Sequence, residues 1–295
     1  IIIKDRANAI FDAVLSSGVT SNTFDIVQCT GVSTLSLKLR LQQKTDLQAL
    51  GGVIGADSTT TINAWLGYLM SNKTIGTGSG EYLIDSINKA VTGDIKIDAN
   101  SLIFKTTGSQ KVSGIVLTGC EHDISIDGLT LNANNLCGRP LTINKESDTV
   151  TRLATINFGV NYKTTNSKGT TSSAIGTYVI GGFERVVFAG EIDGANQDNG
   201  DSAVTSGLLV THTGGYFVRN TLIKGTARFK NITNQNSTLK DADGFKVFAP
   251  VGELTATLTV EPGAYFENNR GRDIKSQVVG NNIHGWISKR TNMTS

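Results

Sequence analysis

The amino-acid sequence predicts an all-β protein, a right-handed parallel β-helix, and two observations lead to this fold class. First, three segments repeat one pattern, an alternating apolar and polar run that ends in a turn with Asn; they are 182–197, 215–235 and 252–270. Second, another short strand-like run follows each turn; these runs are 206–212, 243–249 and 272–278. Repeats built from short strands and Asn or Gly turns indicate the stacked rungs of a solenoid.

The turn asparagines give the length of one rung. They are Asn134, Asn196, Asn234 and Asn268. The last three are 38 and 34 residues apart (234 − 196 and 268 − 234), which we take as one rung. An earlier copy of the pattern covers 121–135 and 139–145. The gap of 62 residues before Asn196 (196 − 134) is longer. We interpret it as one rung that carries a polar insertion at 162–176.

Composition narrows the function classes. The chain has 295 residues with 33 glycines and three prolines, which suits many strands joined by tight turns. Its net charge is +2 and 18% of residues are charged, so neither nucleic acid nor an anionic membrane is expected as a partner. No apolar run approaches the roughly 20 residues of a membrane span. We expect Cys29, Cys120 and Cys137 to be buried apolar residues, with no metal and no cofactor.

Residues 1–50 are interpreted as a small entry or attachment element. DRANAIFDAVL (5–15) has apolar residues at helical spacing, which predicts a helix. TLSLKLRL (34–41) has a leucine at every second position, which predicts a strand with the leucines on one face. The chain begins with IIIKDR rather than Met and ends at TNMTS, so we expect a fragment or a processed piece, truncated at the C-terminal side.

Residues 51–92 are expected to hold a capping helix and the first rung. Asp57 or Ser58 is placed to cap a helix whose apolar stripe is Ile62, Trp65, Leu66 and Leu69. Such a stripe must be buried, and the open end of a β-helix must be covered. We therefore expect this helix to pack its apolar stripe against the first rung. The following segment, 73–85, reads as strand, glycine turn and strand. Because a strand follows GTGSG (76–80), the glycines do not indicate a phosphate-binding loop.

Residues 93–295 are expected to form one parallel β-helix domain. No linker rich in Pro, Gly or Ser interrupts 93–280. The interior is predicted to hold apolar side chains that stack from rung to rung. The residues expected to be buried are Ile124, Ile126, Leu129, Val187, Leu209, Phe229, Phe245 and Phe266.

The entry region also resembles a known family. The matching residues are Gly51–Gly52, Asp57, Thr59–Thr61, Ile62, Trp65, Gly80, Tyr82 and Ile84. They resemble the start of pectate-lyase-like β-helix proteins, above all bacteriophage tailspikes that act as polysaccharide depolymerases. The chain departs from the pattern where a glycine run replaces a proline, and it has one acidic residue before the helix where the pattern often has several. The resemblance covers roughly 49–280 and specifies the fold better than the reaction.

This resemblance implies a set of expectations about function. The chain would be a homotrimer on the phage tail, in contact with other tail proteins and acting at the bacterial cell surface. It would bind and cleave a capsule, exopolysaccharide or O-antigen, by hydrolysis or by β-elimination. The alternative is a non-enzymatic receptor-binding or adhesin β-helix that recognises a glycan. A third reading, a secreted bacterial enzyme similar to pectate lyase or polygalacturonase, fits less well because no signal peptide is visible.

Aligning the rungs points to a site at one corner. The alignment puts Leu209, Lys246 and Lys275 in one column, with charged residues upstream of each strand. Glycoside hydrolysis needs two carboxyl groups about 5–10 Å apart, and neighbouring rungs lie about 4.8 Å apart. We therefore predict catalytic carboxylates and a set of substrate-binding residues. The catalytic residues are Asp241, Asp243 and Asp273; the substrate-binding residues are Arg272, Lys275, Lys246 and His212.

Two further readings of these residues stay open. The carboxylates could instead cap turns and pair with Lys246 or Arg272 at the surface, because Asp–Gly is also a plain turn signal. RGRDIKSQ (270–277) resembles a stretch near the working face of phage tailspikes, which implies that Arg272 and Lys275 bind an acidic sugar.

Glu191, Asp193 and Asp201 are the next candidates for catalysis. Tyr216, Tyr265 and Trp286 are candidate aromatic platforms for a sugar.

Overall fold

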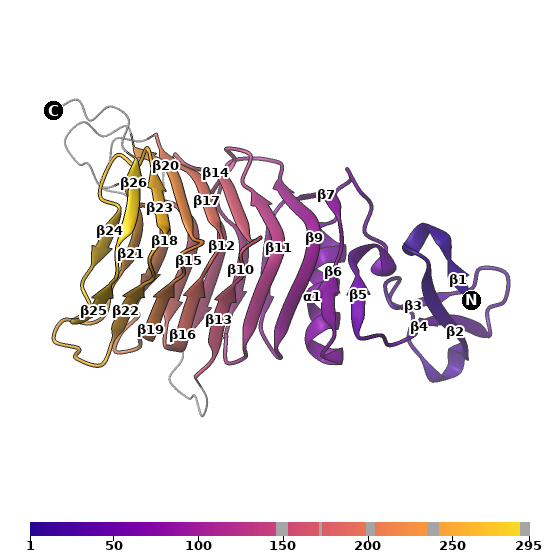
Figure 1. Ribbon diagram of the computed structural model, residues 1–295. Coiled ribbons are helices and arrows are strands. Elements are labelled where there is room, and N and C mark those ends of the chain that lie inside the picture. The colour runs from indigo at the N-terminus through magenta and orange to yellow at the C-terminus, as the bar shows by residue number, and fades with distance from the viewer. Residues whose placement is uncertain (146–152, 171–172, 199–203, 235–241, 290–295) are drawn as a thin grey trace.

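The structure is a computed structural model that describes residues 1–145, 153–170, 173–198, 204–234 and 242–289. The chain forms a parallel β-helix preceded by one helix and a small N-terminal sheet (Figure 1). Every described pair of named strands from β5 (Lys44–Asp46) onward is parallel. The antiparallel pairs between named strands join β1–β4. The predicted fold class, an all-β parallel solenoid with a helix at its start, is confirmed.

The rungs form three faces. Face 1 consists of β8 (Ile87–Ala90), β10 (Lys111–Thr118), β12 (Cys137–Lys145), β15 (Ala174–Gly181), β18 (Thr205–Thr211), β21 (Ala242–Val247) and β24 (Ile274–Ser276). Two long strands, β9 (Ile95–Thr106) and β11 (Ile124–Asn132), bend and belong to both other faces. Face 2 continues from their first halves with β13 (Thr155–Phe158), β16 (Phe183–Phe188), β19 (Val218–Ile223), β22 (Thr257–Val260) and β25 (Gly280–Ile283). Face 3 continues from their second halves with β14 (Lys163–Gly169), β17 (Glu191–Gln197), β20 (Arg228–Asn234), β23 (Ala264–Glu267) and β26 (Trp286–Lys289).

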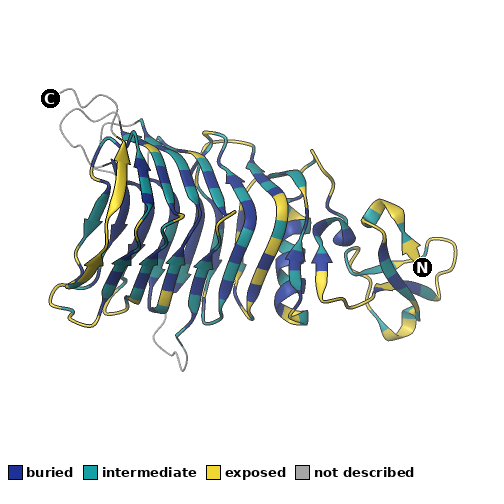
Figure 2. Cartoon of the chain, viewed as in Figure 1, coloured by how far each residue is buried: buried dark blue, intermediate teal, exposed yellow. Residues whose placement is uncertain are grey.

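The core is a set of apolar columns that run through successive rungs. Phe188, Phe229 and Phe266 are fully buried and stack, with ring centroids 5.3 and 5.2 Å apart. Figure 2 shows the alternation of buried and more accessible residues along the rungs. Of the residues predicted to be buried, all but one are. The exception is Val187, which is half-buried while its neighbour Val186 is buried, so that alignment was wrong by one residue on this strand.

The helix α1 (Thr59–Asn72) covers the first rung, formed by β6 (Ile75–Thr77), β7 (Gly80–Ile84) and β8 (Figure 1). The predicted apolar stripe is buried, and Trp65 Nε1 donates to the carbonyl of Thr45 at 3.1 Å. The helix packs so closely that a Cβ at Gly76 would lie 2.5 Å from the Trp65 ring. At its start, the Asp57 carboxylate accepts from the backbone N–H of Thr59 at 3.0 Å.

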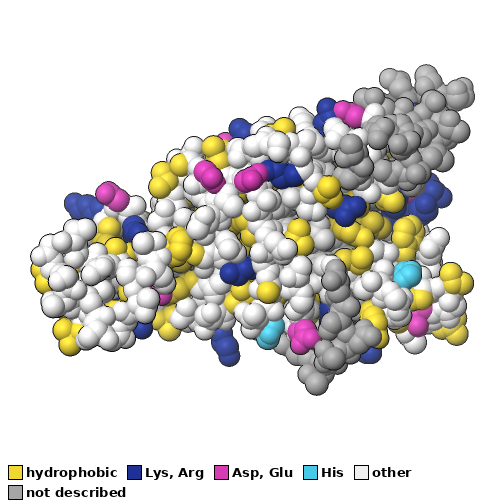
Figure 3. Space-filling model, turned by 180° about the vertical axis from the view of Figure 1, so that it is seen from behind, with side chains coloured by type: hydrophobic (Ala, Val, Ile, Leu, Met, Phe, Trp, Pro, Cys, Tyr) yellow, Lys and Arg dark blue, Asp and Glu magenta, His cyan; other side chains and the backbone are white. Residues whose placement is uncertain are grey.

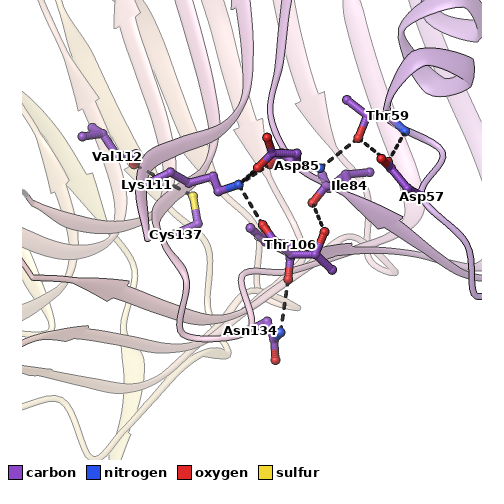
Figure 4. A network of polar contacts seen from close by, with 10 residues as sticks. Asp57, Thr59, Ile84, Asp85, Thr106, Lys111, Val112, Asn134 and Cys137 are labelled. Carbon is purple, nitrogen blue, oxygen red and sulfur yellow. Dashed lines mark hydrogen bonds and ion pairs between the residues drawn. The ribbon is translucent and has the colours of Figure 1, made fainter. Parts of the chain in front are cut away.

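A polar network joins this helix start to the next rungs (Figure 4). Thr59 Oγ1 accepts from the backbone N–H of Asp85 at 2.9 Å. Lys111, on the following rung, pairs with the Asp85 carboxylate and also donates to the carbonyls of Asp85 and Thr107 at 3.0 and 2.8 Å. Asn134, one rung later, donates to the carbonyl of Thr106 at 3.1 Å. The contacts of Lys111 with Asp85 and of Asn134 with Thr106 therefore join successive rungs at this edge.

The N-terminal sheet differs from the sequence prediction. Its strands are β1 (Ile2–Ile3), β2 (Ala9–Leu15), β3 (Ile26–Gln28) and β4 (Leu35–Leu39), with short 3-10 turns η1 (Lys4–Arg6), η2 (Ser16–Gly18) and η3 (Leu47–Leu50). Residues 9–15 form a strand, so the predicted helix over 5–15 was wrong. Antiparallel pairing with β4 decides this, because it buries Phe11 opposite Leu39. The predicted strand within 34–41 is confirmed as β4.

The supposed insertion at 162–176 is in fact part of a rung. β13, β14 and the start of β15 form a complete turn of the solenoid between β11 and β16. The inward positions of β14 include Thr164 and Ser167, both buried. Because these inward positions hold small polar residues, the alternation of apolar and polar residues seen in the other rungs is absent from β14, and the sequence did not predict a strand there. The space is filled by Tyr162, which is fully buried and whose hydroxyl lies 2.9 Å from that of Thr177.

Candidate functional site

The predicted column on face 1 is present. In the strand register Leu209 pairs with Lys246, and Lys246 pairs with Lys275. The same register places Ser206 opposite Asp243. The rung alignment from the sequence was therefore correct at this position, and the charged residues around it come together at the last rungs of face 1.

Asp243 lies at the centre of this charged corner but does not reach the surface. Its side chain is 0% exposed, and that of Lys246 is 1% exposed. One Asp243 carboxylate oxygen lies 3.6 Å from Lys246 Nζ. The other accepts from the backbone N–H of Arg272 at 2.6 Å and lies 3.5 Å from its Nε. This pairing with Lys246 and Arg272 matches the turn-holding reading, although two of the three residues are buried rather than at the surface.

The remaining predicted site residues make the following contacts. Asp273 is buried and accepts from Trp286 Nε1 at 3.2 Å. Lys275 Nζ lies 5.7 Å from the centroid of the Phe248 ring. His212 Nδ1 lies 3.3 Å from the carbonyl of Gly214. Asp201 and Asp241 lie outside the described residues. A contact between any of these residues and a glycan stays a prediction.

A second region, at the edge between faces 2 and 3, forms an open groove. Its volume is about 550 Å³, within the range of small-molecule sites. It crosses four consecutive rungs. The lining residues are Ala99, Asn100, Ser101, Ile103, Gly128, Thr130, Val160, Asn161, Tyr162, Lys163 and Glu191. Amides, hydroxyls, two opposite charges and a few apolar side chains therefore meet in one open space.

The groove arises because neighbouring rungs turn this edge with different numbers of residues. On β9, three residues (99–101) lie between the paired positions Asp98 and Leu102, whereas on β11 only Gly128 lies between Asp127 and Leu129. Gly128 has a φ of +68°, and a Cβ there would lie 1.9 Å from the carbonyl oxygen of Ala99. A side chain is excluded at this point. The β11 edge is therefore recessed between its neighbours.

Three charged side chains from three rungs meet at one end of the groove. Lys163 on β14 and Glu191 on β17 are register partners. Lys163 Nζ lies 2.5 Å from one Glu191 carboxylate oxygen, and Lys230 Nζ, on β20, lies 2.7 Å from the other. Burial alone would raise the pKa of Glu191, but the hydrogen bonds and charges of Lys163 and Lys230 outweigh it and lower that pKa. Glu191 is therefore ionised at neutral pH.

Lys230 is held in its charged form as well. The hydrogen bond to Glu191 is the main cause that raises its pKa. Asp193, two positions along β17, accepts from Asn231 Nδ2 at 2.7 Å. Asn231 in turn accepts from Asn268 Nδ2 at 3.3 Å, so these side chains form a ladder between rungs. The arrangement can bind polar or charged groups of a ligand, and Glu191 can accept a proton rather than donate one.

The candidate aromatic platforms are only partly accessible. Arg228 lies 5.6 Å from the centroid of the Tyr265 ring, from the preceding rung, and Lys289 lies 5.8 Å from it, from the following one. Cations therefore occupy both sides of this ring along the solenoid axis. Tyr216 and Trp286 are 39% and 46% exposed, but neither lines the groove.

Sequence reasoning found Glu191 and Asp193 only as secondary candidates and missed Lys163. The signal was available in the register. Treating 162–176 as an insertion removed Lys163 from the alignment, although as a rung residue it pairs directly with Glu191. Thr130 and Ile103 occupy the same column on the two preceding rungs. The recess at Gly128 has no local pattern that distinguishes it from an ordinary turn glycine.

No cluster of three or more His, Cys, Asp or Glu residues able to hold a metal occurs among the described residues. Within those residues, no helix is long and apolar enough to span a membrane. On the side seen in Figure 3, acidic and basic side chains are interspersed among uncharged and apolar ones.

No protein-family model matches the sequence, and a search of curated proteins finds no match. Among solved structures, the chain is similar to the enzymatically active domain of tailspike protein 2 from bacteriophage CBA120. The TM-score is 0.38 and the sequence identity 11%. The match covers 96% of this chain and 48% of that one, so this chain spans about half the length of the tailspike domain.

Proposed function

We propose that this chain is the glycan-binding β-helix of a phage tailspike that binds and cleaves a bacterial surface polysaccharide. The observation that carries the proposal is the open groove across four rungs, with Lys163 and Glu191 at one end. Sugars present hydroxyl groups on an apolar ring. The groove offers complementary groups, since Ser101 and Thr130 supply hydroxyls and Val160 an apolar side chain that is 56% exposed.

The position of the groove suits a polymer better than an isolated small molecule. It is open and lies on an edge that continues along the solenoid, so a chain could extend beyond it on either side. Family resemblance at the entry region supports the same substrate class, a capsule, exopolysaccharide or O-antigen. The same resemblance supports a homotrimer on the virion that contacts other tail proteins.

For cleavage, we propose Glu191 as the general base or nucleophile, because its lowered pKa keeps the carboxylate ionised. Asp241, Asp243 and Asp273 stay proposed catalytic residues from the sequence, with Arg272, Lys275, Lys246 and His212 as proposed substrate contacts. Of these, Asp273 and Asp243 are buried, so a role in catalysis requires the last rungs of face 1 to open. β-Elimination would use the ionised Glu191 to take a proton from the sugar. Hydrolysis would also need a second carboxyl group to protonate the leaving oxygen, and among the described residues Glu191 is the only carboxylate that lines the groove.

A specific observation also favours a non-enzymatic receptor-binding protein. Lys163 and Lys230 each form an ion pair with one oxygen of Glu191. Such pairing suits a structural role better than proton transfer. In that case the groove binds the glycan and releases it unchanged. The two functions share the site and differ only in turnover.

The experiment is to incubate the protein with a panel of capsular polysaccharides, exopolysaccharides and O-antigens and to measure binding and cleavage separately. New reducing ends indicate hydrolysis, and the ultraviolet absorbance of an unsaturated uronate indicates elimination. Cleavage that is lost in Glu191→Gln while binding is kept supports the enzyme. Binding without either product supports the receptor-binding protein, and no binding to any polymer contradicts both. Light scattering that gives three times the mass of one chain supports the trimer.

A further inference from the structure

The carboxylates at the groove have their acceptor oxygens in use. Both oxygens of Glu191 lie within ion-pair distance of a lysine. Asp127, behind the recessed edge, accepts from the backbone N–H of Gly128 at 3.0 Å and of Asn161 at 2.7 Å. Its other oxygen lies 3.5 Å from Asn161 Nδ2. Each of these oxygens therefore already has a hydrogen-bond donor nearby, and the negative charge of Glu191 is balanced by two lysines.

Lys163, by contrast, has more hydrogen-bond donors than its ion pair with Glu191 uses. A lysine ammonium has three N–H donors. In the described part of the chain, Lys163 forms an ion pair with Glu191, and the Lys163 side chain is 37% exposed. Lys163 lines the groove, whereas Lys230 does not. The strongest hydrogen-bonding capacity that the groove still offers is therefore cationic.

We infer that the groove selects a sugar unit that carries an anionic group, such as the carboxylate of a uronate, and that Lys163 binds this group. The inference rests on the proposed function, because it names the class of sugar that the proposed site takes. Hydrogen bonds between an ammonium and a carboxylate are about twice as strong as neutral ones. The hydroxyls of Ser101 and Thr130 lie in the same groove and can bind the ring hydroxyls of the same unit.

In this arrangement Glu191 competes with the ligand for Lys163. The carboxylate of Glu191 and the carboxylate of the sugar both bind the Lys163 ammonium. The charge of Glu191 therefore limits how tightly an anionic sugar is held. Removing its charge frees Lys163. Glu191→Gln should therefore strengthen the binding of an anionic sugar by roughly two- to fivefold, the strength of a partly exposed ion pair. If the groove instead bound neutral hydroxyls through the carboxylate, the same variant would weaken binding. The sign of the effect separates the two cases.

The test is a titration of the full chain with D-glucuronate and, separately, with D-glucose. The signals of the Ile103 and Val160 methyl groups are followed by NMR, because both side chains line the groove. We expect glucuronate to shift these signals at concentrations where glucose does not. Lys163→Met should weaken glucuronate binding by about tenfold or more. Lys96→Met, which removes an exposed lysine from face 2, is the matched control and should change nothing.

Three outcomes would overturn the inference: equal shifts with both sugars, no shift with either, or weaker glucuronate binding in Glu191→Gln. These results are distinguishable from failure of the proposed function. If the groove does not prefer glucuronate, yet the protein binds a neutral polymer in the panel of polysaccharides, the function stands and the inference about charge fails. If no polymer binds while glucuronate does, the groove is an anion site and the proposed function fails.

Discussion

The molecule has two charged regions, and they use their charges differently. At the last rungs of face 1, Asp243 and Lys246 are buried, and Asp243 also binds the backbone of the next rung. At the edge between faces 2 and 3, Lys163 and Glu191 are partly exposed and line an open groove. Both regions pair residues across neighbouring rungs, so the strand register alone makes them look alike.

We infer from this difference that accessibility, rather than the presence of paired charges, distinguishes a charge pair that holds the fold from one that is available to a ligand. A buried charge is costly unless it is paired, and removing one partner leaves the other buried alone. An exposed pair contributes little to stability because water and salt screen it. The face 1 corner should therefore respond to mutation through stability, and the groove through binding.

The largest effect is expected for Asp243→Ala. It leaves Lys246 buried without this carboxylate and removes the acceptor of the Arg272 N–H. We expect a loss of about 3–5 kcal/mol in the free energy of unfolding, measured by urea denaturation. Asp193→Ala removes a carboxylate from face 3 and is the control, expected to cost much less. A stable Asp243→Ala protein that fails only in cleavage would restore Asp243 as a catalytic residue and reverse the comparison.

Gly128→Ala should have the next largest effect. The substitution combines a positive φ with a clash against the Ala99 carbonyl oxygen. The strain alone costs about 1–2 kcal/mol, and the clash adds to it. Gly55→Ala is the matched control, since Gly55 also has a positive φ, of +76°, but nothing lies within 4 Å of the added Cβ. Equal urea midpoints for the two variants would contradict the close packing that recesses the β11 edge.

Lys163→Met should reduce polysaccharide binding by about tenfold, because it removes the accessible cation of the groove. The free energy of unfolding should change by less than about 1 kcal/mol, the usual range for a partly exposed ion pair. The two quantities are measured on the same protein preparation. A large loss of stability with unchanged binding would make the groove resemble the face 1 corner.

The smallest effect is a dependence of stability on pH. The folded-state pKa of Glu191 is below its ordinary value of 4.5. The ionised form is thus favoured by folding, and its contribution is present above pH 4.5 and lost as pH falls through the lowered pKa. Urea midpoints of the parent protein should therefore fall more steeply below that pH than those of Glu191→Gln. Parallel curves would show that the two lysines do not stabilise the carboxylate.

Most of the fold could be predicted because rungs repeat. The apolar stripe of α1 and the column of Leu209, Lys246 and Lys275 follow from local spacing. The prediction failed where a long-range partner decides the structure. Residues 9–15 fit helical spacing, yet pairing with β4 makes them a strand. β14 was missed because Thr164 and Ser167 replace apolar core residues.

The candidate site could be predicted less well than the fold. The alignment placed Asp243, Lys246 and Arg272 together correctly, but it contained no information on how far their side chains are buried. Burial of Lys246 depends on the tertiary structure. The groove was missed for a different reason, since it depends on the difference in length between two turns, at 99–101 and Gly128. Only the register reveals that difference.

The measurement that tests the central claim most directly is polysaccharide binding by a variant with a filled groove. Thr130 lies in the lining between Ile103 and Lys163, so Thr130→Trp places a large ring in the open space. Thr259→Trp, at a half-buried position of face 2 on β22, is the control for adding a ring elsewhere. We predict that Thr130→Trp keeps its melting temperature and loses binding to every polysaccharide that the parent binds, while Thr259→Trp binds normally. Parental binding by a folded Thr130→Trp protein would contradict the claim that the groove is the glycan site.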